Sequence, residues 1–515
     1  MERHMKKLSQ MREKAMLGGG QEQIEKHRAQ GKYTARERIE KLLDPGSFHE
    51  TGMMAETICT DFGMDKKRFL GDGLISGFGK INGRRVSLFA SDPTVLGGSG
   101  QSTHIRKIVE SIDSAGKFGI PLIQLYDSSG GRVQEGFGQV AFSGSNFYSN
   151  TMVSGVVPQI SAIMGRCAGF AVYASALTDF VIMVDQIGQM YITGPRIIKE
   201  VTGEEISLED LGGAKVHAQI TGCADFRVTS ELECLELIRK LLSYLPANCQ
   251  ETPPMVNLGD DPNRMDEELE RIVPEDPKKS YDMHKVILRL IDNGEFLEVK
   301  REFGRNSITG FARMNGRSVG IIANQPTFYA GSLSVDSSDK CARFIRFCDA
   351  FNIPIVSLID TPGYLPGVKQ EHLGIIRRGA KLLYAFCAAT VPKVSVVIRK
   401  GYGGALFAMG GHKMHGTDLC LAWPNAEFAV MGAEEAVELL YRKELSSAEN
   451  RGKLKKTLIE EYREKFANPY YVASRMVIHE VIEPRETRQK IIAGLEYSSG
   501  KKIPQLWKKH GIMPM

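Results

Sequence analysis

The sequence predicts an α/β protein in which one structural unit occurs twice. Three observations lead to this prediction. The length of 515 residues exceeds what one hydrophobic core usually organises, a long stretch of the first half returns in the second, and short apolar runs alternate with helical patterns. We therefore expect two large domains in tandem.

The repeat is seen by comparing the two halves directly. The stretch "GFGKINGRRVSLFASDPTVLGGS" (77–99) returns without a gap as "GFARMNGRSVGIIANQPTFYAGS" (310–332). The same offset pairs Asp127 with Asp360 and Gly130 with Gly363. After a slip of one position, the pairing resumes between the stretches that begin at Val157 and Val391. Such a long register indicates an internal duplication.

The elements follow in order along the chain. Residues 1–44 are charged with helical spacing, and Thr34 is placed to cap a helix that ends before Asp44 and Pro45. Strands are predicted at apolar runs bounded by glycine or proline, and helices where apolar residues recur near i, i+3, i+4 and i+7. The strand runs include "RRVSLFA", "PLIQLYD", "PQISAIM" and "DFVIMVD", and the helical stretches include "THIRKIVESIDSAGKFG" and "DKCARFIRFCDAFN".

A surface linker is predicted between the two copies. Residues 251–277 are rich in Pro, Asp and Glu, so we expect domains at 1–260 and 261–515. Residues 450–468, near the end of the second copy, are predicted to form a solvated helix, because their charged residues are typical of an exposed face.

The composition excludes several classes of protein. The net charge of +5, from 66 basic and 61 acidic residues, is too small an excess to predict nucleic-acid or membrane-surface binding. Nine cysteines without a CxxC pair predict reduced thiols rather than a zinc ribbon. The N-terminus has no apolar signal region, and no uninterrupted apolar run approaches the length of a membrane span. We therefore expect a cytoplasmic protein without membrane insertion.

Each copy places a glycine-bearing turn between an apolar strand and a helix. The turns read "GRCAGFAVYASA" in the first copy and "GYGGALFAMGG" in the second. Such a turn leaves backbone N–H groups unpaired at the helix start, where they suit an anion or a developing oxyanion. Glycines that only permit close packing of helix on strand are the alternative. Neither a P-loop nor a Rossmann fingerprint is present.

Covalent and metal chemistry have weaker support. Ser128, Ser129 and Cys167 lie beside the turns, but no GxSxG elbow occurs and the histidines show no triad spacing. His412 and His415 are at positions i and i+3 without a carboxylate to complete a metal set, so we expect surface histidines and no metal site.

Several long motifs occur together in one order. They include "GKYTARERIEKLLDPGSFHE", "LYDSSGGRVQEG", "GRCAGFAVYASALTDFVIMV", "DKCARFIRFCDAFNIPIVSLIDTPGYLPG", "RKGYGGA" and "AWPNAEFAVMG". With them the chain resembles, over nearly its whole length, the carboxyltransferase (β) subunits of biotin-dependent acyl-CoA carboxylases, especially the propionyl-CoA carboxylase branch. The resemblance implies two tandem crotonase-like domains and a homohexamer built as a trimer of dimers.

The resemblance also implies a division of labour between the turns. Gly169 and Phe170 would donate backbone N–H groups to the thioester oxyanion of the acyl-CoA enolate, and Gly404 and Ala405 to the ureido oxygen of biotin. Each site would combine the N-domain of one subunit with the C-domain of its partner. By the same resemblance, further substrate-binding residues are Gly130, Gly131, Arg132, Leu406 and Phe407.

Other polypeptides must complete the reaction. The chain has no A-M-K-M biotinylation site and no ATP-binding glycine loop, so carboxybiotin would arrive in trans. The implied partners are a biotin carboxylase and a biotin carboxyl carrier protein, or a fused α subunit.

Two departures from the family pattern bear on the substrate. Phe170 replaces the second glycine of the usual "CAGGAVYSPA", and Leu406-Phe407 replaces the Tyr-Asp of "GGAYD". Propionyl-CoA is thus the family default. One alternative is the α subunit of a methylmalonyl-CoA decarboxylase, which runs the transfer in reverse. The second alternative, supported by Phe170, is a non-catalytic ring subunit.

Overall fold

The structure is a computed structural model that describes residues 1–100, 102–504 and 507–515, with the backbone alone at 137–143. It divides into unit 1, Met1–Glu251, and unit 2, Thr252–Met515. The sequence places the division after residue 260. Residues 252–260 belong to unit 2 because their hydrogen bonds lie there: Val256 N–H donates to Gly316 O at 3.0 Å, and the Asp260 carboxylate accepts from Asn293 N–H at 2.9 Å.

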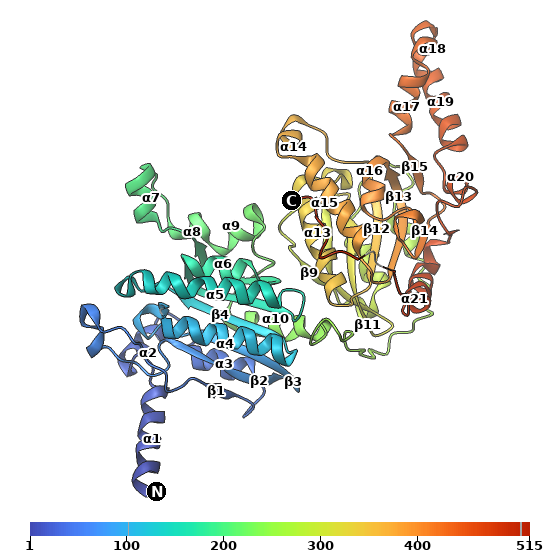
Figure 1. Ribbon diagram of the computed structural model, residues 1–515. Helices are drawn as coiled ribbons and strands as arrows, with labels where there is room; N and C mark the ends of the chain where they lie inside the picture. The colour runs from blue at the N-terminus through green and yellow to red at the C-terminus, as the bar shows by residue number, and fades with distance from the viewer. Residues whose placement is uncertain (101, 505–506) are drawn as a thin grey trace. The chain divides into compact units, whose positions relative to one another are not determined.

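The centre of unit 1 is one mixed sheet (Figure 1). Its strands run in the order β1-β2-β3-β4-β5-β6-β8, with β7 beside the end of β5. β1, β2 and β3 are antiparallel, and the pairs from β3 onward are parallel. The strands are β1 (His49–Thr51), β2 (Leu74–Ile81), β3 (Arg84–Ser91), β4 (Leu122–Ser128), β5 (Gln159–Ala168), β6 (Phe180–Val184), β7 (Gln189–Tyr191) and β8 (Phe226–Val228).

Helices cover both faces of this sheet. Alternate residues of β4 face opposite sides, and Leu122 and Tyr126 join the core beneath α4 and α5. The other face packs against α3 and α10. The helices of unit 1 are α1 (Glu2–Met16), α2 (Gln21–Arg28), α3 (Ala35–Leu42), α4 (Ser102–Phe118), α5 (Phe137–Val153), α6 (Phe170–Ala176), α7 (Pro195–Thr202), α8 (Leu208–Gly212), α9 (Ala214–Val216) and α10 (Glu231–Tyr244).

Unit 2 repeats this sheet strand for strand. Its order is β16-β14-β13-β12-β11-β10-β9, with β15 beside the end of β13. The bounds of β10, β11 and β12 are those of β2, β3 and β4 moved by the constant offset of the sequence repeat. The strands are β9 (Leu297–Val299), β10 (Ser307–Met314), β11 (Arg317–Asn324), β12 (Ile355–Thr361), β13 (Lys393–Tyr402), β14 (Leu419–Ala422), β15 (Glu427–Ala429) and β16 (Glu480–Val481). The predicted α/β duplication is confirmed.

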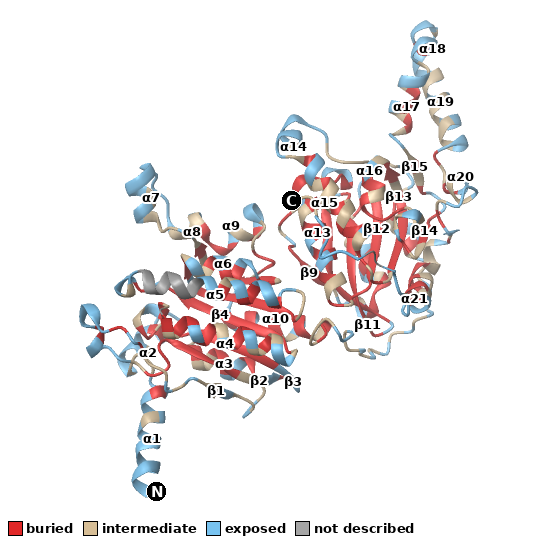
Figure 2. Ribbon diagram, in the orientation of Figure 1, coloured by how far each residue is buried: buried red, intermediate tan, exposed pale blue. Residues whose placement is uncertain are grey.

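The helices of unit 2 add a charged extension. The Arg451–Lys465 helix, α19, has no fully buried residue, which confirms the solvated helix predicted at 450–468. The helices are α11 (Leu269–Ile272), α12 (Met283–Leu290), α13 (Val335–Ala350), α14 (Val368–His372), α15 (Ile375–Ala388), α16 (Gly403–Ala408), α17 (Ala433–Leu440), α18 (Arg442–Ser447), α19 (Arg451–Lys465), α20 (Pro469–Ala473) and α21 (Thr487–Tyr497). In each unit the strands form the buried centre (Figure 2).

The same hairpin opens both sheets. Asn82 and Gly83 join β2 to β3 with φ of 50° and 77°, and the Asn-Gly pair at 315–316 repeats them with 52° and 74°. Positive φ at both central residues belongs to a type I′ turn, for which Asn-Gly is the favoured pair. Asp44 accepts both turn N–H groups in unit 1, and Asp292 does so in unit 2.

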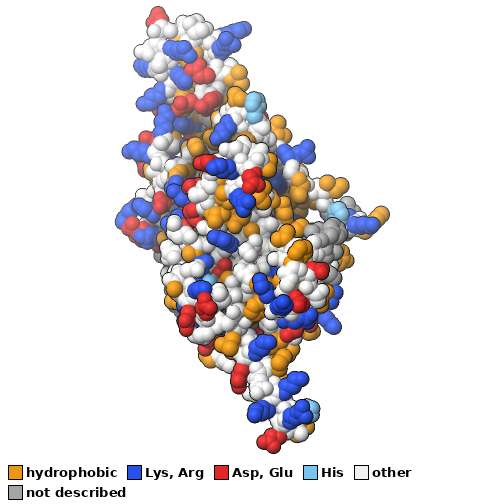
Figure 3. All heavy atoms as spheres, turned by 90° about the vertical axis from the view of Figure 1, so that its left-hand side faces the viewer, with side chains coloured by type: hydrophobic (Ala, Val, Ile, Leu, Met, Phe, Trp, Pro, Cys, Tyr) orange, Lys and Arg blue, Asp and Glu red, His pale blue; other side chains and the backbone are white. Residues whose placement is uncertain are grey.

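Two predictions for segments outside the repeat can be compared with the structure. Thr34 caps α3 and forms a capping box with Glu37, which confirms the predicted cap. The predicted surface linker at 251–277 is partly wrong, because it contains α11, whose Leu269 is buried in the core of unit 2. Basic and acidic side chains are interspersed on the face shown in Figure 3. Within the ranges that the structure describes, no helix is both long and apolar enough to cross a bilayer.

Candidate functional site

The first glycine turn lies at the end of β5. Gly169 has φ of +64°, which favours glycine, and α6 begins at Phe170. The Gly169 N–H donates to the carbonyl of Tyr191 at 3.2 Å, so the sheet already uses it. The N–H groups of Phe170 and Ala171 lie in the first turn of α6, where a helix offers no internal acceptor. Phe170 and Ala171 are therefore the residues whose N–H groups remain candidate donors at this turn, and the role predicted for Gly169 and Phe170 stays a prediction.

The second glycine turn has the same geometry in unit 2. Gly403 follows β13 with φ of +55°, and Gly404 and Ala405 come next in α16. Aligning β5 with β13 end to end pairs Gly404 with Phe170 and the following alanines with each other. The donors predicted for this turn, Gly404 and Ala405, are therefore the positional counterparts of Phe170 and Ala171 in unit 1.

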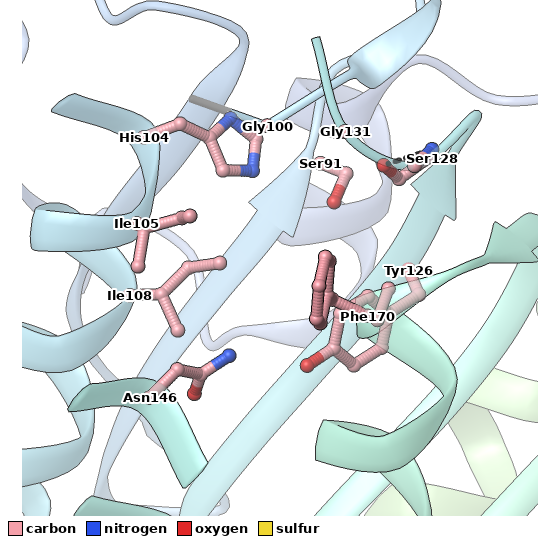
Figure 4. A pocket seen from close by; sticks show the side chains of 12 residues that line it. Ser91, Gly100, His104, Ile105, Ile108, Tyr126, Ser128, Gly131, Asn146 and Phe170 are labelled. Carbon is pink, nitrogen blue, oxygen red and sulfur yellow. Dashed lines mark hydrogen bonds between the residues drawn. The ribbon is translucent and has the colours of Figure 1, made fainter. Parts of the chain in front are cut away.

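A pocket of about 50 Å³ opens beside the first turn (Figure 4). Gly130, Gly131 and Phe170 line it, together with Ala171. The remaining lining residues come from β3, β4, α4, α5 and the loop before α4: Ser91, Gly100, His104, Ile105, Ile108, Tyr126, Ser128 and Asn146. Three of the predicted site residues therefore share one cavity.

The loop after β4 forms one wall of this pocket with its backbone. Gly130 has φ of +100°, and a Cβ there would lie 3.1 Å from the carbonyl oxygen of Ala168. Its own carbonyl accepts from Gly100 N–H at 2.8 Å. Glycine is thus required at this position, because the loop passes so close to the end of β5.

Arg132 does not line the pocket. Its side chain is buried, with a salt bridge of 2.7 Å to Asp72 and a hydrogen bond of 3.0 Å from Nε to the Ser99 hydroxyl. Arg132 therefore fixes the loops behind the pocket, whereas the resemblance implies that it binds substrate.

The two residues that follow Ala405 have different surroundings. Leu406 is buried, with its side chain against the space left by the absent side chains of Gly401 and Gly411. It packs in the core of unit 2, although the resemblance assigns it to substrate binding. Phe407 is half-buried, and its ring centroid lies 4.9 Å from that of His415 and 5.7 Å from that of His412.

The surroundings of Cys167 and Ser128 indicate a structural role for each, and not that of a nucleophile. Cys167 is fully buried, and burial raises the pKa of its thiol to about 12. Such a thiol stays protonated and is a poor nucleophile. The Ser128 hydroxyl accepts from Gly130 N–H at 3.2 Å and so supports the loop. Within the described ranges, no group of three His, Cys, Asp or Glu side chains could hold a metal ion.

Sequence reasoning missed three polar residues of the pocket. Ser91, His104 and Asn146 line it, but none belongs to a motif that predicts chemistry. His104 lies on α4 beside Ile105 and Ile108, so its spacing is typical of a core position. The sequence signal for His104 was weak: a single histidine on the apolar face of a predicted helix.

Known proteins resemble this chain over its full length. It is 50% identical over 515 residues to the carboxyltransferase subunit of propionyl-CoA carboxylase from Haloferax mediterranei, covering 100% of both chains. It is 48% identical over 508 residues to the α subunit of methylmalonyl-CoA decarboxylase from Propionigenium modestum, covering 99% of this chain and 98% of that one.

A solved structure and a family model agree with these relatives. The crystal structure of transcarboxylase 12S, a hexamer with methylmalonyl-CoA bound, superposes with a TM-score of 0.97 at 46% identity and covers 100% of this chain and 98% of that one. This match confirms the predicted fold of two crotonase-like domains. The family model described as "Carboxyl transferase domain" matches residues 26–513. The chain therefore belongs to the carboxyl transferase family.

Proposed function

We propose that this protein transfers CO₂ from carboxybiotin, carried on a separate polypeptide, to the α-carbon of a short acyl-CoA, most simply propionyl-CoA. The observation that carries the proposal is the pair of equivalent turns at the ends of β5 and β13, of which the first borders a pocket. The carboxyltransferase relatives support the same reaction class.

The two turns suit the two charges that this reaction develops. Loss of the α-proton puts negative charge on the thioester oxygen, which the N–H groups of Phe170 and Ala171 would stabilise. Carboxybiotin supplies the carboxyl group, and the N–H groups of Gly404 and Ala405 would hold its ureido oxygen. One such donor contributes about 10²- to 10³-fold in rate, so the pair of turns accounts for much of the catalysis together with positioning.

A reversed reaction is the second candidate. The α subunit of methylmalonyl-CoA decarboxylase is 48% identical to this chain, nearly as similar as the carboxylase subunit. Both reactions pass through the same enolate, so the turns serve either direction. A gene for a biotin carboxylase beside this one would favour carboxylation, and one for a membrane subunit would favour decarboxylation. A non-catalytic role has less support, since Phe170 keeps its backbone N–H.

The assembly belongs to the same proposal. A homohexamer built as a trimer of dimers, working in the cytoplasm, would receive carboxybiotin from a biotin carboxylase and its carrier protein or a fused α subunit. The hexameric transcarboxylase 12S structure, with a TM-score of 0.97, supports this arrangement.

The test is reconstitution. The purified chain with ATP, bicarbonate and propionyl-CoA should form no methylmalonyl-CoA, because the sequence has no biotinylation motif and no nucleotide loop. Added biotin carboxylase and biotinylated carrier should start turnover. Carboxylation by the chain alone, or none with the complete set, would contradict the proposal.

A further inference from the structure

The pocket of unit 1 contains a buried hydroxyl that the proposed reaction does not use. Ser91 is the last residue of β3 and is 1% exposed. Within the described residues, its Oγ has no hydrogen-bond partner. Figure 4 shows this hydroxyl projecting into the space that the pocket residues enclose. A buried hydroxyl without a partner costs free energy, which a ligand with a matching polar group would recover.

His104 presents an acceptor to the same space. It is 3% exposed, and its Nδ1 lies 3.1 Å from the carbonyl oxygen of Asp72. Because a carbonyl only accepts, the proton is on Nδ1, and Nε2 is left with a lone pair. Burial first, and then the charge of Arg132, lowers the pKa of His104 to about 3, so the ring stays neutral at physiological pH.

Arg132 explains how this ring is held. Its guanidinium pairs with the Asp72 carboxylate at 2.7 Å. Asp72 in turn accepts from His104 through its backbone carbonyl. Arg132 is therefore a positioning residue, which acts on the pocket through Asp72.

The equivalent positions in unit 2 are used differently. The constant offset of the repeat pairs Ser91 with Asn324 and His104 with Ser337. Asn324 donates to Gly331 O at 3.1 Å and accepts from Asp360 N–H at 3.2 Å. The Ser337 hydroxyl donates to Ser334 O at 3.1 Å. The unpartnered hydroxyl and the free imidazole nitrogen therefore belong to unit 1, the side assigned to acyl-CoA.

We propose that Ser91 and His104 form a subsite for a secondary amide, with the Ser91 hydroxyl donating to the amide oxygen and His104 Nε2 accepting the amide N–H. This inference rests on the proposed function, since an acyl-CoA carries secondary amides in its pantetheine arm. Ile105 and Ile108, which lie beside His104 in the pocket (Figure 4), suit the methylene groups of that arm. Ser91 and His104 are then specificity-determining residues of the acyl-CoA side.

The first test separates a ligand role from a structural one. Ser91→Ala should raise the KM for propionyl-CoA about tenfold, the usual effect of one lost hydrogen bond, and leave the melting temperature unchanged, because the hydroxyl has no partner among the described residues of the free protein. Ser87→Ala is the matched control on the same strand. The buried Ser87 hydroxyl donates to Ser111 O at 2.9 Å, so its loss should lower the melting temperature and leave KM unchanged. The subsite is ruled out if Ser91→Ala behaves like this control.

The second test asks whether His104 Nε2 accepts a hydrogen bond from an amide N–H of the ligand. Two inhibitors of propionyl-CoA carboxylation are compared: S-propionyl-N-acetylcysteamine and the analogue in which an ester oxygen replaces its N–H. The native protein should bind the amide about tenfold more tightly than the ester. His104→Phe should abolish this preference, whereas His104→Gln, which keeps a polar atom near the position of Nε2, should retain part of it.

The outcomes distinguish the subsite from the proposed function. Equal inhibition constants for amide and ester with the native protein, or an unchanged ratio in His104→Phe, would overturn the subsite alone. Failure of the native protein to carboxylate propionyl-CoA under full reconstitution would overturn both. Because His104 is neutral, the amide preference of the native protein should be the same at pH 6 and pH 8; a loss of preference at pH 6 would contradict a neutral acceptor.

Discussion

Asp127 and its repeat counterpart Asp360 are buried carboxylates at equivalent positions, but each forms an ion pair with an arginine from a different element. In unit 1 the nearer cation is Arg38 from α3, whose Nη2 lies 3.0 Å from the Asp127 carboxylate, with Lys32 Nζ at 3.9 Å. In unit 2 it is Arg399 from β13, at 3.0 Å from Asp360. Position 399 corresponds to Gly165 in unit 1. The glycine there leaves room for Asp127, because a Cβ would lie 1.9 Å from its Oδ1.

Gly165→Ala should therefore destabilise unit 1. The added methyl group displaces Asp127 from Arg38, and breaking a buried ion pair costs about 3–5 kcal/mol. Denaturant unfolding measures this loss. Gly144→Ala in α5 is the control, because no atom of the described side chains and backbone lies within 4 Å of the added carbon, and it should be neutral or stabilising by up to about 1 kcal/mol. Equal stability of the two variants would refute the steric argument.

Phe407 is the residue at which the acyl preference can be tested. The family resemblance implies that its ring lines the acyl pocket, and we propose that it would restrict this pocket to short unbranched groups. Phe407→Ala should then raise kcat/KM for butyryl-CoA relative to propionyl-CoA by about tenfold, within the usual range for a change of a methylene group. The ratio of the two kcat/KM values measures this effect.

Leu406→Ala is the matched control for that experiment. Leu406 packs in the core of unit 2, so its truncation should cost about 2–5 kcal/mol of stability and leave the chain-length profile unchanged. If Phe407→Ala also lowers the melting temperature without altering the profile, Phe407 is a packing residue beside His412 and His415.

At the scale of single elements, substitutions at the start of α6 test which N–H groups would stabilise the thioester oxyanion of the proposed enolate. Phe170 is the first residue of α6, a position where proline is well tolerated. Phe170→Pro removes the ring and the N–H, whereas Phe170→Ala removes the ring alone. We expect kcat to fall about 10²-fold in the proline variant relative to the alanine variant, measured as carboxylation of propionyl-CoA. Similar rates for the two variants would exclude the Phe170 N–H as a donor.

The strands and turns were largely predictable because their signals are local. Apolar runs marked β3, β4 and β5, and the repeat carried each assignment to the second copy, with a slip of one position before β5. The Asn-Gly pairs at 82–83 and 315–316 carry an equally local signal for a hairpin turn, although no hairpin was predicted from them. The sequence could not predict which N–H groups of the first turn are unpaired. Only the structure shows that the Gly169 N–H already donates to the carbonyl of Tyr191.

The pocket depended on contacts between distant segments. Ser91 and His104 belong to a strand and a helix whose spacing predicts core positions. They reach the same cavity as Phe170 only when β3, α4 and α6 are assembled. Arg132 was assigned to substrate through its motif, and its partner Asp72 lies far away in the sequence, before β2. Such pairings follow from tertiary structure and leave no local pattern.

At the scale of the whole molecule, a site shared between subunits predicts complementation. Phe170→Pro damages the first turn and Gly404→Pro the second, and each variant alone should carboxylate propionyl-CoA about 10²-fold more slowly than the native protein. Hexamers assembled from both should regain part of the activity, because some sites would combine two intact turns. Carboxylation by mixed and unmixed samples, with assembly checked by sedimentation, measures this recovery. Well-assembled mixtures without activity would contradict the shared site.

The central claim is that this chain moves a carboxyl group between biotin and an acyl-CoA. The most direct measurement is a single-turnover transfer of labelled carboxyl from an isolated carboxylated biotin carrier protein to propionyl-CoA, with ATP and biotin carboxylase left out. We expect the label to appear in methylmalonyl-CoA with the native protein and about 10²-fold more slowly with Phe170→Pro. Label that stays on the carrier, or moves at the same rate without the chain, would contradict the account.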